Sequence, residues 1–159
     1  MIVEVVTASL SHSRAIWRWR NDPVTRSMFR SKDLISWEDH SNWYQKTLAN
    51  PNRITYVSIT EQLPIGVVRF DLINNLEDSF EISININPLE RSKGLGLKLL
   101  KNALHILKQE RTSAKKILAE VKKENPASNR LFMSCDFIPL QTSESGFNSY
   151  LYTYNLWNV

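Results

Sequence analysis

Apolar and polar residues alternate most clearly over residues 80–87, and this period of two predicts a strand with one buried face. Its apolar positions are Phe80, Ile82, Ile84 and Ile86. A similar pattern covers residues 54–60 and 65–73 on either side of a turn at 62–64, so these two segments predict a hairpin. Two asparagines, Asn74 and Asn75, are expected to end it.

Four more segments are rich in β-branched and aromatic residues and are predicted to be strands. They cover residues 1–7, 117–122, 137–140 and 149–156. Pro126 stands where helices often start, which predicts a short helix between the second and third of these strands.

Three other helices are predicted from spacing and capping residues. Leucines three and four apart indicate a helix after residue 94, and its apolar stripe would be Leu97, Leu100, Leu104 and Leu107. Ser36 and Asp39 form a capping box that opens a helix ending near residue 48. The first helix would be capped by Ser9 or Ser11 and would end at the Asn-Asp-Pro run of residues 21–23.

The composition is that of a soluble globular protein, with 42% hydrophobic and 23% charged residues in 159, so one domain over residues 1–159 is expected. No apolar run approaches the ~20 residues of a membrane span, and the N-terminus lacks the basic start of a signal peptide. The single cysteine, Cys135, allows no intramolecular disulfide and fits a reducing cytosol. A cytoplasmic location is therefore predicted.

The charge of the chain favours an anionic ligand, because the formal net charge is +4. The lysines and arginines are spread along the sequence instead of being clustered with aromatic residues, so nucleic-acid binding is not expected. Three histidines and one cysteine show no zinc-binding spacing, and no metal is expected. A homodimer is compatible with the sequence.

The segment with the clearest chemistry follows the alternating strand and opens the leucine-rich helix. Two of the four glycines of the chain lie in it, one residue apart. Glycine allows close backbone approach to a ligand, and a helix N-terminus offers unpaired amides and a positive dipole end. The segment therefore predicts a pyrophosphate cradle. Its members are Arg91, Ser92, Lys93, Gly94, Leu95 and Gly96.

Two other phosphate motifs fit this segment less well. A dinucleotide fingerprint needs a third glycine where the chain has Leu99, and a P-loop needs Gly-Lys-Ser/Thr where Gly96 is followed by Leu97. An ordinary strand–turn–helix stays open as an alternative. The pattern Arg-x-x-Gly-x-Gly resembles the acetyl-coenzyme A (acetyl-CoA) pyrophosphate loop of the GNAT N-acetyltransferases.

A second segment, residues 124–137, resembles another GNAT signature, Glu-Asn-x-x-Ala/Ser-x-x-x-Tyr-x-x-x-Gly-Phe. The resemblance implies that Asn125 contacts coenzyme A. Phe132 stands where the family has a tyrosine that can protonate the leaving thiolate, and Asp136 replaces the glycine. Ser134 and Cys135 lie close enough in sequence to substitute for the tyrosine, or they are an ordinary surface serine and a buried cysteine.

The predicted element order, β-α-α-β-β-β-α-β-α-β-β, is also that of the GNAT fold. The resemblance therefore implies an α+β or α/β protein with a mixed, mostly antiparallel sheet of about seven strands and about four helices. It implies acetyl-CoA as co-substrate in the wedge between the strands that carry Glu81 and Glu120. A backbone amide between Ile84 and Ile86 would polarise the thioester carbonyl.

The N-terminal third carries a narrower resemblance, to nucleotide-sugar N-acetyltransferases that acetylate the 4-amino group of a UDP-linked sugar in pseudaminic acid biosynthesis. Trp-Arg-Asn-Asp-Pro at residues 19–23 and His-x-x-Trp at residues 40–43 are among the matching motifs. The resemblance implies that the acceptor site contains Arg20, Met28, Phe29 and His40. Arginine suits phosphate because its forked donors bind oxygens in pairs. Alternatively, Arg20 is only a helix-terminal cation.

Two carboxylates are candidates for the base that takes a proton from the acceptor amine. Glu120 lies in an otherwise apolar strand that is expected to be central, where an unpaired charge is costly, and is preferred. Glu81 lies on the polar face of the alternating strand. Either could instead be a structural ion-pair partner.

Two other functions stay open at this point. One is acetylation of a protein N-terminus, as in ribosomal-protein acetyltransferases. The other is an acetyl-CoA binding module without catalysis, which the phenylalanine at position 132 motivates.

Overall fold

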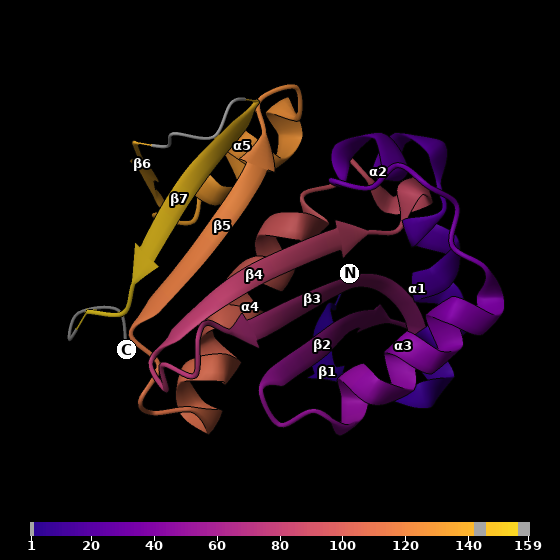
Figure 1. The fold of residues 1–159 in the computed structure, drawn as a ribbon, viewed down its shortest axis with the longest axis horizontal. Helices are drawn as coiled ribbons and strands as arrows, with labels where there is room; N and C mark the ends of the chain where they lie inside the picture. The colour runs from indigo at the N-terminus through magenta and orange to yellow at the C-terminus, as the bar shows by residue number, and fades with distance from the viewer. Residues whose placement is uncertain (1, 142–145, 156–159) are drawn as a thin grey trace.

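The computed structural model describes residues 2–141 and 146–155, which form one seven-stranded sheet in the order β1-β2-β3-β4-β5-β7-β6 (Figure 1). Neighbouring strands are antiparallel except β4 and β5. The strands are β1 Glu4–Thr7, β2 Arg53–Thr60, β3 Leu63–Leu72, β4 Ser79–Ile86, β5 Lys116–Lys122, β6 Ile138–Leu140 and β7 Phe147–Thr153. The predicted mixed, mostly antiparallel sheet is confirmed.

Over the described residues, five α-helices connect these strands, one more than the sequence predicts. They are α1 Ser13–Arg20, α2 Pro23–Met28, α3 Trp37–Ala49, α4 Leu95–Glu110 and α5 Pro126–Met133. Two short 3-10 turns, η1 Leu10–His12 and η2 Pro88–Glu90, precede α1 and α4. No helix within the described ranges is long and apolar enough to cross a membrane.

The two faces of the sheet are covered by different helices. The larger core contains α4 and α5 and is centred on side chains such as Phe70, Phe80, Leu100 and Ile117, each at most 1% exposed. A smaller cluster around Trp19 packs α1 and α3 against the opposite face of β2 and β3. That opposite face is covered only in part, which leaves room for a site beside α3.

The hairpin turn lies earlier than the sequence predicts. Glu61 and Gln62 have φ angles of 47° and 66°, so the left-handed pair that reverses the chain ends before Leu63. Pro64 therefore lies in β3, opposite Ile59, next to an irregularity in the β2–β3 register. The predicted end of the hairpin at two asparagines is confirmed, since both have positive φ angles.

Helix α2 was missed because its cap also ends the preceding helix. The carboxylate of Asp22 accepts a hydrogen bond from the amide of Thr25 at 3.0 Å, and Pro23 occupies the first helical turn. The cap predicted for α3 is confirmed, because the hydroxyl of Ser36 accepts from the amide of Asp39 at 3.0 Å.

The apolar stripe of α4 is rotated relative to the prediction. Leu100, Leu104 and Leu107 are buried as predicted, but Leu97 is only half-buried. The stripe is completed by Leu95, Leu99 and Ala103, which extend it toward the start of the helix. The predicted strand at 149–156 starts two residues earlier and ends at Thr153, and position 156 lies outside the described residues.

Candidate active site

The site starts where β4 and β5 separate. The two strands pair only over three residues each, and Glu81, opposite Leu118, is the last member of β4 to pair. β4 continues to Ile86 and β5 to Lys122 while the strands diverge (Figure 1). Backbone amides and carbonyls on this side of residues 82–86 are therefore available to a ligand, because such groups need a partner.

The predicted pyrophosphate loop lies next to this opening. Gly94 has a φ of 73° and stands at the N-cap of α4, where it provides no capping side chain. The first amides of a helix have no acceptor within the helix. Nothing lies within 4 Å of the position that a Cβ on Gly94 would take. The loop therefore presents unpaired donors toward open space, which fits a diphosphate.

The charged side chains of this loop point elsewhere. Arg91 pairs with the carboxylate of Asp22 at 3.2 Å and donates to the hydroxyl of Thr25, so it ties the loop to α2. Lys93 pairs with Glu90 at 2.8 Å. Burial alone would raise the pKa of Asp22, but the Thr25 amide and the Arg91 guanidinium hold that pKa below its usual range. The groups that this loop leaves for an anion are therefore mainly backbone amides.

The second predicted cofactor segment has mostly structural contacts. The side chain of Asn125 caps α5 by accepting from the amide of Ser128 at 3.1 Å. Phe132 is 3% exposed and packs in the core, with ring centroids 5.0 Å from Phe137 and 6.2 Å from Tyr150. The structure therefore leaves Phe132 little surface for contact with a cofactor.

The two substitutes considered for the missing tyrosine are also in structural roles. The hydroxyl of Ser134 donates to the carbonyl of Arg130 at 2.8 Å. Cys135 is buried, and desolvation raises the pKa of its thiol to about 11. Neither side chain offers a proton at neutral pH more readily than an ordinary serine or cysteine.

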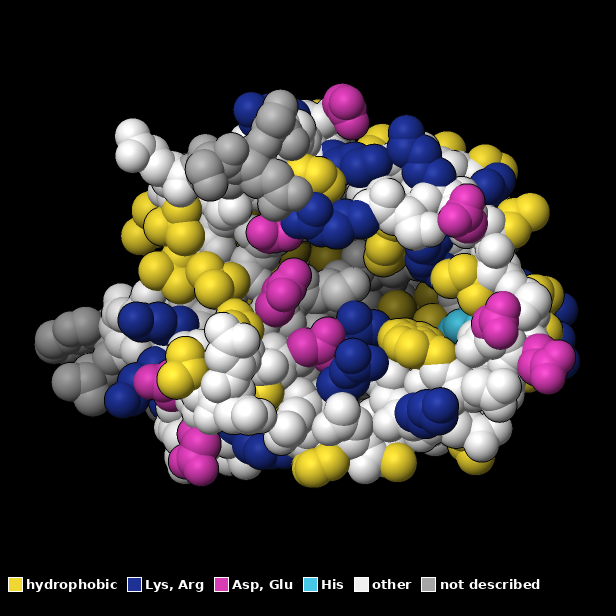
Figure 2. Space-filling view, viewed as in Figure 1, with side chains coloured by type: hydrophobic (Ala, Val, Ile, Leu, Met, Phe, Trp, Pro, Cys, Tyr) yellow, Lys and Arg dark blue, Asp and Glu magenta, His cyan; other side chains and the backbone are white. Residues whose placement is uncertain are grey.

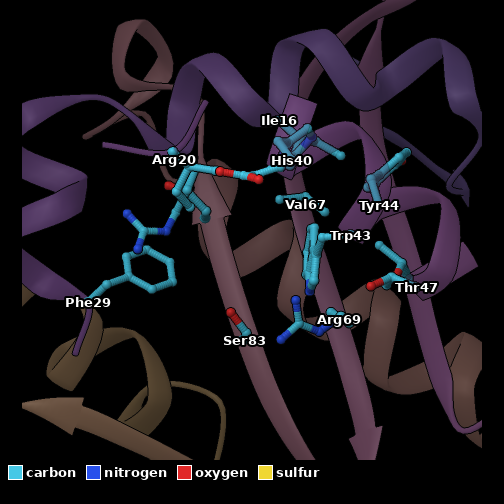
Figure 3. Close-up of a pocket in the computed structure, with 14 residues that line it drawn as sticks. Ile16, Arg20, Phe29, His40, Trp43, Tyr44, Thr47, Val67, Arg69 and Ser83 are labelled. Carbon is cyan, nitrogen blue, oxygen red and sulfur yellow. The ribbon is translucent and has the colours of Figure 1, made fainter. Parts of the chain in front are cut away.

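A cavity of about 390 Å³ lies beside α3, on the face of the sheet that α1 and α3 cover (Figure 3). Arg20, Phe29 and His40 of the predicted acceptor set line it, whereas Met28 is not among the lining residues. The other lining residues come from α1, α3, β2, β3 and β4, and from the loop that precedes α3. They include Ile16, Ile35, Asp39, Trp43, Tyr44, Thr47, Thr55, Val67, Arg69, Ser83 and Asn85.

Arg20 is incompletely hydrogen-bonded in this cavity. Its Nη2 donates to the carbonyl of Ser31 at 3.0 Å, and its guanidinium lies 4.1 Å from the ring centre of Phe29. Its Nη1 is buried and has no hydrogen-bond partner. Burial and the nearby Arg26 lower the pKa of Arg20. Because an unpaired buried donor is costly, this nitrogen marks a place for an anionic or carbonyl oxygen.

His40 is held by its surroundings. Its Nε2 lies 3.0 Å from the carbonyl of Ser13, and its ring stacks with Tyr44 and Trp37 at 5.6 and 5.8 Å. Burial lowers the pKa of His40, so the imidazole is neutral at pH 7. It contributes shape and aromatic surface to the cavity rather than positive charge.

Trp43 and Arg69 form a second cation–aromatic pair at the cavity wall. The Arg69 guanidinium lies 5.1 Å from the Trp43 ring centre (Figure 3), and its Nε donates to both carboxylate oxygens of Asp71, at 2.9 and 3.0 Å. Trp43 is 39% exposed, so its ring is available to a ligand. Arg69 falls within the strand predicted over residues 65–73, and its polar position there is the one signal in the sequence that could have pointed to it.

The two candidate bases lie where β4 and β5 separate. Glu81 is the last residue of β4 that pairs with β5, and its register partner is Leu118. Glu120 lies two residues after Leu118, so the side chains of Glu81, Leu118 and Glu120 are on one face of the sheet. Ser83, two residues after Glu81, lines the cavity on that face. The two carboxylates therefore lie on the face of the sheet that carries the cavity.

Glu120 is not buried, contrary to the expectation of a costly charge in an apolar central strand. Its side chain is 37% exposed and forms an ion pair with Arg30. The physical reason is that β5 alternates, with Ile117, Ala119 and Val121 facing the core and the glutamate facing the open side. Its charge therefore carries little desolvation cost.

The surroundings of Glu81 shift the pKa of its carboxyl group, although the residue is exposed overall. Desolvation raises its pKa, as do the negative charges of Glu120 and Asp71, while Arg30 and Arg69 oppose this rise. A carboxylate with a raised pKa is a stronger proton acceptor near neutral pH. Among the described residues, no cluster of His, Cys, Asp and Glu side chains could hold a metal ion.

Comparison with known proteins agrees with this architecture. The sequence profile of a family described as Acetyltransferase (GNAT) domain matches residues 3–138. None of the curated proteins matches the sequence.

Several solved structures share the fold. Spermidine N-acetyltransferase from Vibrio cholerae, in complex with CoA and spermine, has a TM-score of 0.81 at 21% identity, covering 95% of each chain. The ribosomal L7/L12 α-N-protein acetyltransferase RimL, in complex with CoA, has a TM-score of 0.80 at 17% identity, covering 95% of this chain and 93% of its own. The putative acetyltransferase yncA from Salmonella typhimurium, with acetyl-CoA, has a TM-score of 0.78 at 18% identity, covering 97% and 95%.

The interaction between the two glutamates can be measured directly. We predict that the Glu81 carboxyl titrates above the ordinary glutamate value of ~4.3 in an NMR titration, and that Glu120→Gln lowers its pKa because a like charge is removed. Glu77→Gln, a change at an exposed glutamate outside the cluster, is the control and should leave the titration unchanged. A Glu81 pKa that does not respond to Glu120→Gln would show that the two groups are not coupled.

Proposed function

This chain belongs to the acetyltransferase (GNAT) domain family, and on that premise we propose that it acetylates the amino group of a nucleotide-linked amino sugar, such as a UDP-linked 4-amino sugar. Membership makes it an acetyl-CoA-dependent N-acetyltransferase. The observation that carries the choice of acceptor is the buried, unpaired Nη1 of Arg20 in a cavity with aromatic walls.

The proposed place of acetyl-CoA is the opening between β4 and β5. Amides of the loop from Arg91 to Gly96 and of the first turn of α4 would bind the pyrophosphate. An amide between Ile84 and Ile86, on the unpaired edge of β4, would donate to the thioester carbonyl. Asn125, at the start of α5, stands beyond the end of β5, on the other side of the opening.

The chemistry needs a proton acceptor more than a proton donor. Acetyl-CoA supplies an acetyl group on a thioester, whose carbonyl carbon bonds to the amine nitrogen while the C–S bond breaks. A thiol with a pKa near ~8.5 leaves as thiolate without much help from an acid, which is consistent with phenylalanine at position 132. The amine proton would pass to Glu81, directly or through water, with Glu120 beside it.

The acceptor cavity supports an anionic, partly aromatic ligand. Arg20 can donate to a diphosphate oxygen, because its Nη1 has no other partner. The exposed ring of Trp43 and the ring of Phe29 offer flat surfaces on which a nucleobase can stack. A volume of about 390 Å³ is in the range of small-molecule sites.

Other acceptors fit these side chains less well. A polyamine or an aminoglycoside would bring several positive charges toward Arg20 and Arg69. A protein N-terminus remains the alternative acceptor, and a non-catalytic acetyl-CoA module the alternative without chemistry. A panel of UDP-amino sugars, ribosomal-protein N-terminal peptides and polyamines, assayed with acetyl-CoA, distinguishes them by which one, if any, is acetylated.

The cofactor loop can be tested at Gly96. A Cβ there would meet Leu131 and Ile86 at 3.5 Å and beyond, so a small side chain fits the fold. We predict that Gly96→Val stays folded but binds acetyl-CoA at least ~10-fold more weakly in calorimetry, because its branches narrow the backbone approach to the pyrophosphate. Lys101→Val, on the exposed side of the same helix, should bind normally. Unchanged affinity of a folded Gly96→Val protein would rule out the loop.

The acceptor site can be tested at Arg20. Loss of a charge-assisted bond to phosphate costs ~1.5–3 kcal/mol, so Arg20→Ala should raise KM for a UDP-amino sugar by ~10–100-fold and leave acetyl-CoA affinity unchanged. Arg18→Ala removes a neighbouring exposed arginine of α1 and should change neither value. A loss of acetyl-CoA affinity in Arg20→Ala would mean that the two sites are assigned the wrong way round.

The base can be tested by comparing the two glutamates. We predict that Glu81→Gln lowers kcat ~10²-fold and removes the acidic limb of the kcat/KM profile, and that Glu120→Gln keeps the limb but moves it to lower pH. The direction follows because Glu120 raises the pKa of Glu81. If Glu120→Gln loses the limb and Glu81→Gln keeps it, Glu120 is the base.

A further inference from the structure

Arg30 connects the N-terminal segment to the strands on the far side of the opening. Its guanidinium forms an ion pair with Glu120 on β5 and lies 4.3 Å from the ring centre of Phe147 on β7. Lys122, on β5, donates to the carbonyl of Ser27 at 3.0 Å and supports the same connection. Arg30 is therefore positioned beside the candidate bases by contacts with two strands, although its side chain is 55% exposed.

The acidic side chains near Arg30 form a cluster next to the acceptor cavity. Asp71 and Glu81 are register partners on β3 and β4, and Glu120 follows on β5, on the same face. Figure 2 shows acidic and basic side chains side by side over this part of the sheet, next to the hollow that leads to the cavity. Arg69 pairs with Asp71, and Arg30 pairs with Glu120.

The balance of charge around the acceptor is consequently set by few residues. Arg20 and Arg69 line the cavity, together with Asp39. Three further carboxylates form the cluster beside it. Arg53 also pairs with Asp71, at 3.7 Å. The four carboxylates are thus balanced by four arginines: Arg20, Arg30, Arg53 and Arg69. Without Arg30, the acids would outnumber the arginines by one, and a surface with excess negative charge attracts a polycation.

We propose that Arg30 sets the charge class of the acceptor: by occupying Glu120, it excludes polycationic amines from the site. This role rests on the proposed function, because it explains how an acceptor with a diphosphate is favoured over one with several ammonium groups. Specificity of this kind comes from a repulsive group as much as from an attractive one.

Arginine is suited to this position for a geometric reason. Its planar guanidinium can pair with a carboxylate through its edge while its face lies on an aromatic ring. Arg30 has such an arrangement, with Glu120 and Phe147 as the two partners. A lysine would keep the positive charge but would hold it less firmly between the two.

The test measures acceptor preference in Arg30→Met, which keeps an unbranched apolar stem but lacks the charge. Spermidine and a UDP-4-amino sugar are assayed in parallel with acetyl-CoA at low salt. We expect kcat/KM for spermidine, relative to the sugar, to rise ~10-fold or more. Arg30→Lys should stay near the wild-type ratio. Arg18→Met, which removes an exposed arginine of α1, is the matched control for net charge and should leave the ratio unchanged.

A second readout separates an electrostatic role from a merely structural one. Arg30 and Arg69 lower the pKa of Glu81, while desolvation, Glu120 and Asp71 raise it. Removal of Arg30 should therefore move the acidic limb of kcat/KM to higher pH, and Arg18→Met should not move it. If Arg30→Met lacks measurable turnover, calorimetric binding of spermidine replaces the kinetic ratio.

The outcomes distinguish this proposal from the one it rests on. An unchanged spermidine-to-sugar ratio in Arg30→Met, or the same rise in Arg18→Met, overturns the role of Arg30 and leaves the acceptor assignment standing. A wild-type protein that acetylates spermidine more efficiently than any UDP-amino sugar overturns the acceptor assignment itself. A rise confined to Arg30→Met, together with the shifted limb, supports both.

Discussion

The separation of β4 and β5 after three paired residues is the constraint on which the site depends. If the two strands stayed paired, the backbone amides and carbonyls of residues 82–86 would all have hydrogen-bond partners, and none would be left for a ligand. Because the strands diverge, the loop that follows β4 and the helix that follows β5 stand on opposite sides of one opening. Glu81 lies at its base, beside the acceptor cavity. One break in hydrogen bonding thus brings unpaired backbone amides, the carboxylate of Glu81 and the cavity beside α3 close together.

Local features of this architecture could be predicted from the sequence. The alternation of β4, the cap of α3 and the glycine loop are each encoded by residues within a few positions of one another. The order of elements then limited the fold, because such an order fits few topologies. Arg20, Phe29 and His40 were named from motifs, and the structure brings them to one cavity.

Long-range ion pairs could not be predicted, because no local pattern specifies them. Arg30 and Glu120 are 90 positions apart, and Arg91 is 69 positions from Asp22. The first pair changes the interpretation of Glu120 from a buried acid to an exposed and paired one. The second shows that the Arg91 side chain links the loop to α2, a contact that the loop motif alone does not indicate. In both cases, the two charged side chains lie close together only because the chain folds.

The phenylalanine at position 132 connects the core to the chemistry. Its ring packs between Phe137 and Tyr150, and Tyr150 already donates its hydroxyl to Asn129. A tyrosine hydroxyl in the same buried place would need a partner of its own, and an unpaired one is costly. The apolar ring thus packs in the core without an unpaired hydroxyl, but it cannot act as a general acid. A thiolate can leave without one, whereas an ammonium group cannot attack until it has lost a proton. In the proposed mechanism, the charge state of Glu81, and the neighbours that set it, therefore matters more than any proton donor at position 132.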